Sequence, residues 1–325
     1  MSFQAKTILF GLLLTFVVVV VGAFVRLTDA GLGCPDWPGC YGKPTPAHAA
    51  ADIAKAVDKQ GGVHGPVSHQ KAWYEMIHRY LAGALGLVIL LIASMAWASR
   101  APRGLPTALV GVVCFQAALG MWTVTLLLKP VIVTLHLLAG MATLALMVWL
   151  AARQFKFRAI PRDARQLRPW AILGLALLSL QIALGGWVST NYAALACIDL
   201  PTCHGEWVPR MDFQHGFQLL RELEQTAAGD KLSYDALTAI HWTHRVGAVI
   251  VATYLTVLAW RVWRAGLRTL AVLLGGLLVL QFTLGVANII TGLKLAVAVA
   301  HNAGAALLLA ALVVLNFWVS ARQTK

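Results

Sequence analysis

The chain has 325 residues, of which 59% are hydrophobic and only 12% charged, and its formal net charge is +13. So apolar a composition excludes an ordinary soluble globular domain. The basic excess would suit a nucleic-acid partner, but the distribution of the charges explains it without one, and we predict no nucleic-acid binding.

Long apolar stretches recur along the whole sequence. A membrane-spanning helix needs ~20 mainly apolar residues. In chain order, we predict eight such helices over Thr7–Val25, Ile77–Trp97, Leu105–Leu128, Val131–Ala152, Trp170–Thr190, Leu237–Trp260, Thr269–Ile290 and Leu295–Val319. The first is predicted to be a retained helix and not a signal peptide, because no small-residue cleavage site follows it. The predicted class is therefore an all-α, polytopic membrane protein.

Basic residues gather on one side of the predicted membrane. With the N-terminus inside, the cytoplasmic segments hold Lys6, Arg100, Arg103, Arg153, Lys156, Arg158, Arg162, Arg165, Arg168, Arg261, Arg264, Arg268, Arg322 and Lys325. Those segments contain one acid, Asp163. This positive-inside pattern predicts a multi-pass protein of the cell inner membrane with both termini in the cytoplasm.

The sequence repeats itself at an offset of about 165 residues. The motif Cys-x-Asp-x-Pro-x-Cys occurs at Cys34–Cys40 and again at Cys197–Cys203. Further matches in the same order are His78-Arg79 with His244-Arg245, Gln116-x-x-Leu-Gly120 with Gln281-x-x-Leu-Gly285, and His136 with His301. The repeat predicts two pseudo-symmetric four-helix bundles, 1–152 and 170–325, joined by a cytoplasmic linker at 153–169.

Two long loops, roughly Asp29–Tyr74 and Asn191–Ala236, are assigned to the outer face. Each contains one cysteine pair, in a compartment where disulfides persist. Within the second loop, apolar residues recur at helical spacing, which predicts a short surface or capping helix. Those residues are Phe213, Phe217, Leu220 and Leu223.

Four histidines lie in the predicted helices at matching places in the two halves: His78, His136, His244 and His301. Ionisable side chains inside a membrane are costly and usually face a functional cavity. Two imidazoles on neighbouring helices can ligate haem iron from both sides, so the pattern predicts one haem site in each half. Polar bonds between helices are the plainer alternative for such histidines. Zinc or copper would need more ligands than the two found in each half.

Small residues follow each of these histidines and could let a flat macrocycle approach the backbone. They are Gly83, Gly140, Gly247 and Gly304. Arg79 and Arg245, each next to a histidine, are candidate partners of haem propionates, with snorkelling to the membrane interface as the alternative.

The repeat breaks one helical turn before the first histidine of each half, where Glu75 corresponds to His241. A carboxylate beside only one haem site indicates that this half performs chemistry requiring an acid or base. The alternative is a favourable charge in the first turn of a helix.

These motifs, together with Val21–Gly31 and the sequences around Glu75–Arg79, Thr134–His136 and His301, resemble the haem A synthase family over essentially the whole chain. The resemblance implies oxidation of the C8 methyl group of haem O to a formyl group, giving haem A for terminal oxidases. By that analogy His78 and His136 hold the substrate haem, and Glu75 is the catalytic carboxylate. His244 and His301 hold haem b, the cofactor.

The resemblance further implies that Cys34 pairs with Cys40 and Cys197 with Cys203, as outer-loop disulfides. Expected partners are haem O, membrane lipid, a haem O synthase and the quinone pool, and a homo-oligomer is left open. The alternative function is a di-haem cytochrome b that only transfers electrons from quinol. A transporter fits less well, because no helix is interrupted at its centre.

Overall fold

We describe the protein from a computed structural model, which defines residues 1–62, 64–99, 102–155 and 162–320. Residues 156–161 of the predicted linker lie outside this set. Five bases of the predicted cytoplasmic side also lie outside it: Arg100, Lys156, Arg158, Arg322 and Lys325.

Helices dominate the described residues, in which no β-strand occurs. The α-helices are α1 (Phe3–Leu27), α2 (Ala50–Lys59), α3 (His69–Ala98), α4 (Gly104–Thr125), α5 (Pro130–Ala152), α6 (Arg168–Thr190), α7 (Phe213–Gly216), α8 (Tyr234–Arg264), α9 (Arg268–Ile290) and α10 (Leu295–Ser320). Short 3₁₀ turns occur at Arg162–Leu167 and Ala193–Leu195. Eight helices in the described residues are long and apolar enough to cross a membrane, which confirms the predicted multi-pass all-α class.

Three of the spanning helices begin at a serine cap. The side chains of Ser2, Ser68 and Ser233 accept a hydrogen bond from the backbone N–H three residues later, at the starts of α1, α3 and α8. Such caps satisfy backbone donors that the first turn leaves free. The caps of α3 and α8 lie ahead of the apolar stretches, so these two helices begin earlier in the chain than the hydropathy predicts.

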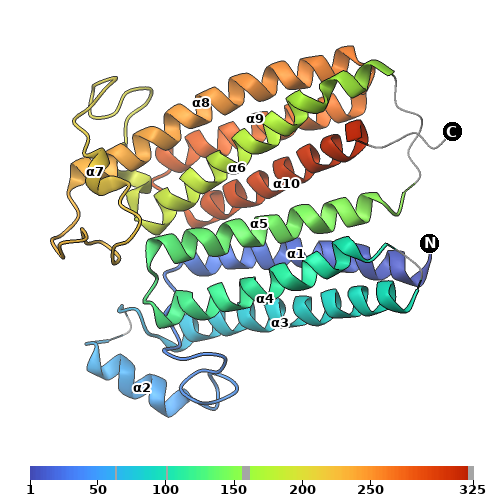
Figure 1. Ribbon diagram of the computed structural model, residues 1–325. Coiled ribbons are helices and arrows are strands. Elements are labelled where there is room, and N and C mark those ends of the chain that lie inside the picture. The colour runs from blue at the N-terminus through green and yellow to red at the C-terminus, as the bar shows by residue number, and fades with distance from the viewer. Residues whose placement is uncertain (63, 100–101, 156–161, 321–325) are drawn as a thin grey trace. The chain divides into compact units, whose positions relative to one another are not determined.

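The chain divides into two compact units. Unit 1 comprises Met1–Thr143 with Leu219–Leu223, and unit 2 comprises Leu144–Gln218 with Glu224–Lys325. In unit 1, α3 packs against α1, α4 and the short α2 (Figure 1). In unit 2, α6 packs on α8, α8 on α9, α9 on α10 and α10 on α6, which closes a ring of four helices. The pseudo-symmetry of the two bundles stays a prediction.

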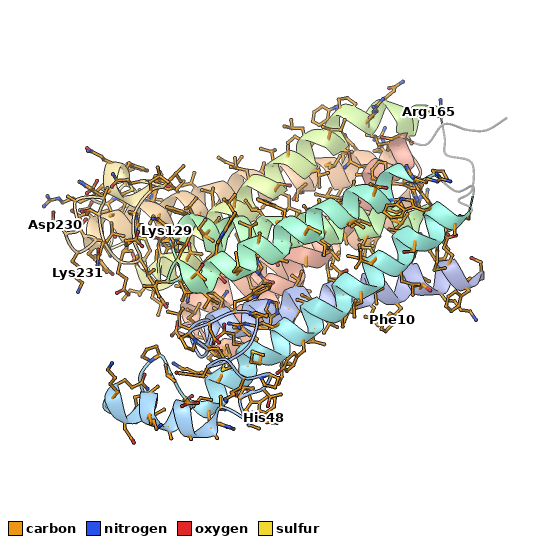
Figure 2. All side chains as sticks on the ribbon, turned by 60° about the horizontal axis from the view of Figure 1, so that its bottom comes forward. Phe10, His48, Lys129, Arg165, Asp230 and Lys231 are labelled. Carbon is orange, nitrogen blue, oxygen red and sulfur yellow. A yellow bond between two sulfur atoms is a disulfide. The ribbon has the colours of Figure 1, made fainter. Side chains whose placement is uncertain are left out.

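Large apolar side chains cover the outer surfaces of the spanning helices. Phe10 on α1 is 57% exposed (Figure 2), and Leu87 on α3 is 70% exposed. In water such side chains would be unfavourable, but lipid tails solvate them. Figure 2 also shows Arg165 at one end of unit 2 and Asp230 and Lys231 at the other, so charged side chains mark both ends.

The first long loop contains the helix α2, which was not predicted. Ile53 of α2 is buried with Cys34, Cys40, Ala72 and Met76 in one apolar cluster. The loop is thus packed onto the start of α3 by its own small core. Its polar sequence hides this helix from a search for long apolar stretches.

The helix predicted over Phe213–Leu223 is wrong beyond its first turn. Only Phe213–Gly216 is helical, with Asp212 as its N-cap. The indole N–H of Trp187 donates to the carbonyl of Gly216 at 2.9 Å, which fixes the end of this turn. Leu220 is 78% exposed, and Glu222 pairs with Lys129 at 2.8 Å within unit 1.

Candidate functional site

In unit 1, His78 of α3 and His136 of α5 face each other. Their ring centroids are 6.5 Å apart, with the ring planes at 81°. Metal–imidazole bonds are ~2 Å long, so this separation leaves room for one metal ion between the rings. Nδ1 of each ring is buried without a hydrogen-bond partner. Because buried polar atoms are normally paired, the two rings fit ligation of a metal.

In unit 2, His244 of α8 and His301 of α10 form the corresponding pair. Nδ1 of His301 is buried without a partner, as is Nδ1 of both rings in unit 1. Among the described residues, no three side chains of His, Cys, Asp or Glu gather as a metal-ion site would require. The opposed imidazoles of unit 1 fit haem iron, whose remaining ligands come from the porphyrin, and the matching histidines of unit 2 offer the same ligand types.

Each of the four histidines packs against a glycine of another helix. A Cβ atom built on the glycine would lie 2.9–3.2 Å from Cε1 of the facing ring, closer than ordinary contact. The pairs are Gly22 with His78, Gly120 with His136, Gly185 with His244, and Gly285 with His301. These glycines let the imidazoles lie directly on the neighbouring backbone. They are not the glycines that the sequence suggested.

Three of the four glycines that were expected to face a macrocycle are contacted by glutamine side chains. Gly140, Gly247 and Gly304 are contacted by Gln116, Gln181 and Gln281 respectively, whereas nothing lies near Gly83. At those three glycines the approach of a macrocycle stays a prediction. They make room for an amide.

The same glutamines reach the histidines. Nε2 of Gln116 donates to the carbonyl of His136 at 3.0 Å. Nε2 of Gln181 donates to the carbonyl of His244 at 2.9 Å and lies 3.0 Å from Nδ1 of that ring. Nε2 of Gln281 lies 3.3 Å from Nε2 of His301.

The sequence analysis missed Gln181. It carries the motif Gln-x-x-Leu-Gly that marks Gln116 and Gln281, so a search for that motif within the helices would have found it.

Glu75 lies one turn before His78 and is only 4% exposed. One carboxylate oxygen accepts the backbone N–H of Cys34 at 2.9 Å, and the other pairs with Arg79. Arg79 also donates to the carbonyls of Asp36 at 2.8 Å and Gly39 at 2.6 Å. Glu75 and Arg79 thus attach the first disulfide loop to α3.

The second loop is attached in a parallel way. His241 is 4% exposed, and its Nδ1 accepts the N–H of Cys197 at 3.1 Å. Arg245 donates to the carbonyls of Thr202, at 3.1 Å, and Asp199. Because a guanidinium has five N–H donors, these contacts leave donors for a propionate, and that role of Arg79 and Arg245 stays a prediction.

Both predicted disulfides are present, with sulfur–sulfur distances of 2.11 Å for Cys34–Cys40 and 2.04 Å for Cys197–Cys203. Within each ring an aspartate turns the chain. Asp36 accepts the N–H groups of Tyr41 and Gly42, both at 2.6 Å.

Asp199 plays the same part in the second ring. It accepts the N–H groups of His204 at 2.8 Å and Gly205 at 2.9 Å, and also the hydroxyl of Thr202 at 2.6 Å. These bonds, led by the one from Thr202, hold the pKa of Asp199 well below its usual range.

Comparison with known proteins places this chain in a family. Residues 5–313 match the family described as cytochrome oxidase assembly protein. A relative named heme A synthase in Shewanella oneidensis is 42% identical, and the match covers 95% of this chain and 94% of the relative. Proteins of the same name in Rhizorhabdus wittichii and Halalkalibacterium halodurans are 29% and 26% identical, over 95% and 90% of this chain and 91% and 90% of those proteins.

Proposed function

The chain belongs to the cytochrome oxidase assembly protein family, and we propose from this premise that it is a haem A synthase. It would oxidise the C8 methyl group of haem O to a formyl group, giving haem A for terminal oxidases. The observation that carries the proposal is Glu75, the one carboxylate buried among the described side chains, which lies one turn before a histidine of unit 1.

The substrate site is assigned to unit 1. His78 and His136 would hold the iron of haem O between their rings, which lie 6.5 Å apart by centroid. Arg79, one residue beyond His78, would extend a free donor to a propionate. The packing of His78 on Gly22 limits rotation of the imidazole, so the porphyrin would bind in a defined orientation.

Glu75 is assigned the proton chemistry. Converting a methyl group to a formyl group replaces two hydrogens on one carbon by one oxygen, which is a four-electron oxidation. With water as the oxygen source, four protons leave the site and four electrons pass to the acceptor. A nearly buried carboxylate one turn from His78 can accept such a proton, because its two oxygens have about four lone-pair sites and the bonds from Cys34 and Arg79 do not use them all. The N–H of Cys34 and the guanidinium of Arg79 hold the carboxylate in place for this role.

The resident cofactor is assigned to unit 2. There His244 and His301 would hold haem b, which supplies one-electron redox chemistry when bound. The neighbouring His241 binds the loop N–H of Cys197 and so is engaged in structure. Unit 2 would accept electrons from the substrate site and pass them to the quinone pool, while a haem O synthase supplies the substrate. Both termini are assigned to the cytoplasmic side of the inner membrane.

The test is to co-express the chain with a haem O synthase and to identify the extracted haems by mass. The wild type should yield haem A, whereas Glu75→Gln should accumulate haem O or a half-oxidised product and keep its haem b spectrum. Glu206→Gln, an exposed change in the second loop, is the control. Wild-type haem A from Glu75→Gln would refute the role of Glu75. Two permanently bound haems of one type, without haem A, would indicate an electron-transfer cytochrome instead.

A further inference from the structure

Three helices carry one arrangement of glutamine and glycine against the histidines. In α4, α6 and α9 a glycine packs on the imidazole, and a glutamine four residues earlier reaches the same histidine. The glutamine–glycine pairs are Gln116 with Gly120, Gln181 with Gly185, and Gln281 with Gly285. A spacing of four residues puts both side chains on one face of the helix.

Helix α1 departs from this arrangement. Gly22 packs on His78 as Gly185 packs on His244, with built Cβ distances to Cε1 of 2.9 and 3.0 Å. Four residues before Gly22 stands Val18, where α6 has Gln181. His78 consequently lacks the amide that His244 has, and its Nδ1 is buried without a partner.

The two units also differ at the position three residues after the histidine. Gln181 is accommodated by Gly247, three residues after His244, because the amide oxygen occupies the space that a Cβ there would need. Three residues after His78 the chain has Leu81. Unit 2 therefore has glutamine and glycine at the two positions where unit 1 has valine and leucine. This pairing is expected, because the amide of Gln181 needs the space that a side chain at position 247 would fill.

The amide matters because an iron-bound imidazole carries its proton on the other ring nitrogen. A partner that accepts this proton fixes the ring and makes it a stronger ligand, and losing such a partner typically costs 10–100-fold in metal affinity. Gln181 lies 3.0 Å from Nδ1 of His244. A turn of the amide would bring its oxygen to Nδ1–H and leave Nε2 of the imidazole free for iron. This turn gives up the bond that Nε2 of Gln181 donates to the carbonyl of His244, so the amide exchanges one hydrogen bond for the other.

We propose that Gln181 is a positioning residue that makes unit 2 retain its haem, and that Val18 in the matching place makes His78 the ligand that releases haem. The inference rests on the proposed function, in which unit 1 must exchange substrate for product while unit 2 keeps its cofactor. The amide contact with the ring of His244, which has no counterpart at His78, would separate a permanent from an exchangeable site.

The first test measures transfer of haem from the purified full-length chain to apomyoglobin. His78→Ala and His244→Ala identify which phase of haem loss belongs to which unit. Gln181→Val should speed the unit 2 phase by about 10–100-fold and raise the reduction potential of that haem, because a weaker imidazole ligand stabilises ferric iron less. Gln181→Val/Gly247→Leu, which fills the cavity, should do the same. Gln154→Val, which removes only a bond to the carbonyl of Leu150, should change neither.

The reverse test installs the amide in unit 1. Val18→Gln/Leu81→Gly should slow the unit 1 phase by about 10-fold or more and increase the haem retained per chain after purification. The proposal is overturned if both Gln181 variants leave the unit 2 phase and the potential unchanged, or if the Val18 variant binds haem and releases it at the wild-type rate. Loss of the unit 2 haem in His244→Ala tests ligation separately, so a failure of the proposed function would be recognised as such.

Discussion

In unit 1 the N–H of Cys34 donates to the carboxylate of Glu75, and in unit 2 the N–H of Cys197 donates to the imidazole of His241. Both acceptors lie one turn before a proposed haem ligand, and both are 4% exposed. In each unit the arginine following that ligand binds carbonyl groups of the same disulfide loop.

The comparison shows that this helical position has a structural task in both units, which is to accept one loop N–H. A carboxylate and an imidazole can both accept this N–H, so the task does not determine which one is present. The structural role therefore does not require glutamate in unit 1, and a catalytic role can explain why this residue is glutamate. It also means that a substitution at Glu75 must keep an acceptor if folding is to be separated from catalysis.

The largest expected difference between the units concerns the histidines proposed as haem ligands. His244→Ala or His301→Ala should abolish the low-spin, b-type absorbance of the purified protein, because a haem with one imidazole loses its low-spin ligation. His78→Ala and His136→Ala should leave that absorbance in place. Retention of an unaltered spectrum by both unit 2 variants would assign haem b elsewhere.

Substitutions of Glu75 and His241, which accept the loop N–H groups, should have the next largest effect. Glu75→His keeps an acceptor for Cys34 but removes the carboxylate, so haem A formation should fall by about 10²–10⁴-fold. His241→Gln keeps an acceptor for Cys197 and should leave haem A formation within a few-fold of wild type. Haem A is quantified by extraction and chromatography. Equal losses in the two variants would mean that both positions act only through the loops.

Removing the disulfides should have a smaller effect on stability. Each joins cysteines six residues apart, and closing so short a loop contributes ~2 kcal/mol in the chain-entropy model. Cys34→Ser/Cys40→Ser should lower haem A formation, because it loosens the loop that holds Glu75. Cys197→Ser/Cys203→Ser should instead loosen the loop held by His241. Limited proteolysis measures the loosening, and the control is the wild type without reductant.

The smallest effect is a difference in acid sensitivity of the second loop. The pKa of Asp199 is lowered by its hydrogen bonds from Thr202, Gly205 and His204. Stabilisation of the loop by the ionised form is thus complete above the ordinary aspartate pKa of ~3.9 and is lost as the pH falls towards the lower folded value. Hydrogen exchange of the loop should rise over that interval in the wild type.

In Asp199→Asn the exchange should be faster at neutral pH and should not change over that acid interval. Asp230→Asn, an exposed change in the same unit, should behave like the wild type. A wild-type acid response in Asp199→Asn would show that another group titrates there.

Hydropathy and repetition alone determined the eight spanning helices, the two matched histidine pairs and the two cysteine pairs. These features are local: a helix that crosses a membrane must be apolar over its full length, and a repeated motif keeps its spacing whatever it contacts. Neither hydropathy nor repetition reveals α2, because its ten residues are amphipathic and not uniformly apolar. This helix is stabilised by packing of Ile53 against the disulfide Cys34–Cys40.

Only the tertiary structure decided which side chains meet. Glu75 and His241 accept loop N–H groups more than forty residues away in sequence, and Gln181 reaches His244 from another helix. Such contacts depend on how each helix is rotated about its axis, and the hydropathy of a membrane helix is nearly uniform around its circumference. The sequence therefore indicated the candidate site residues, while helix packing decided which glycines face the imidazoles and which face an amide.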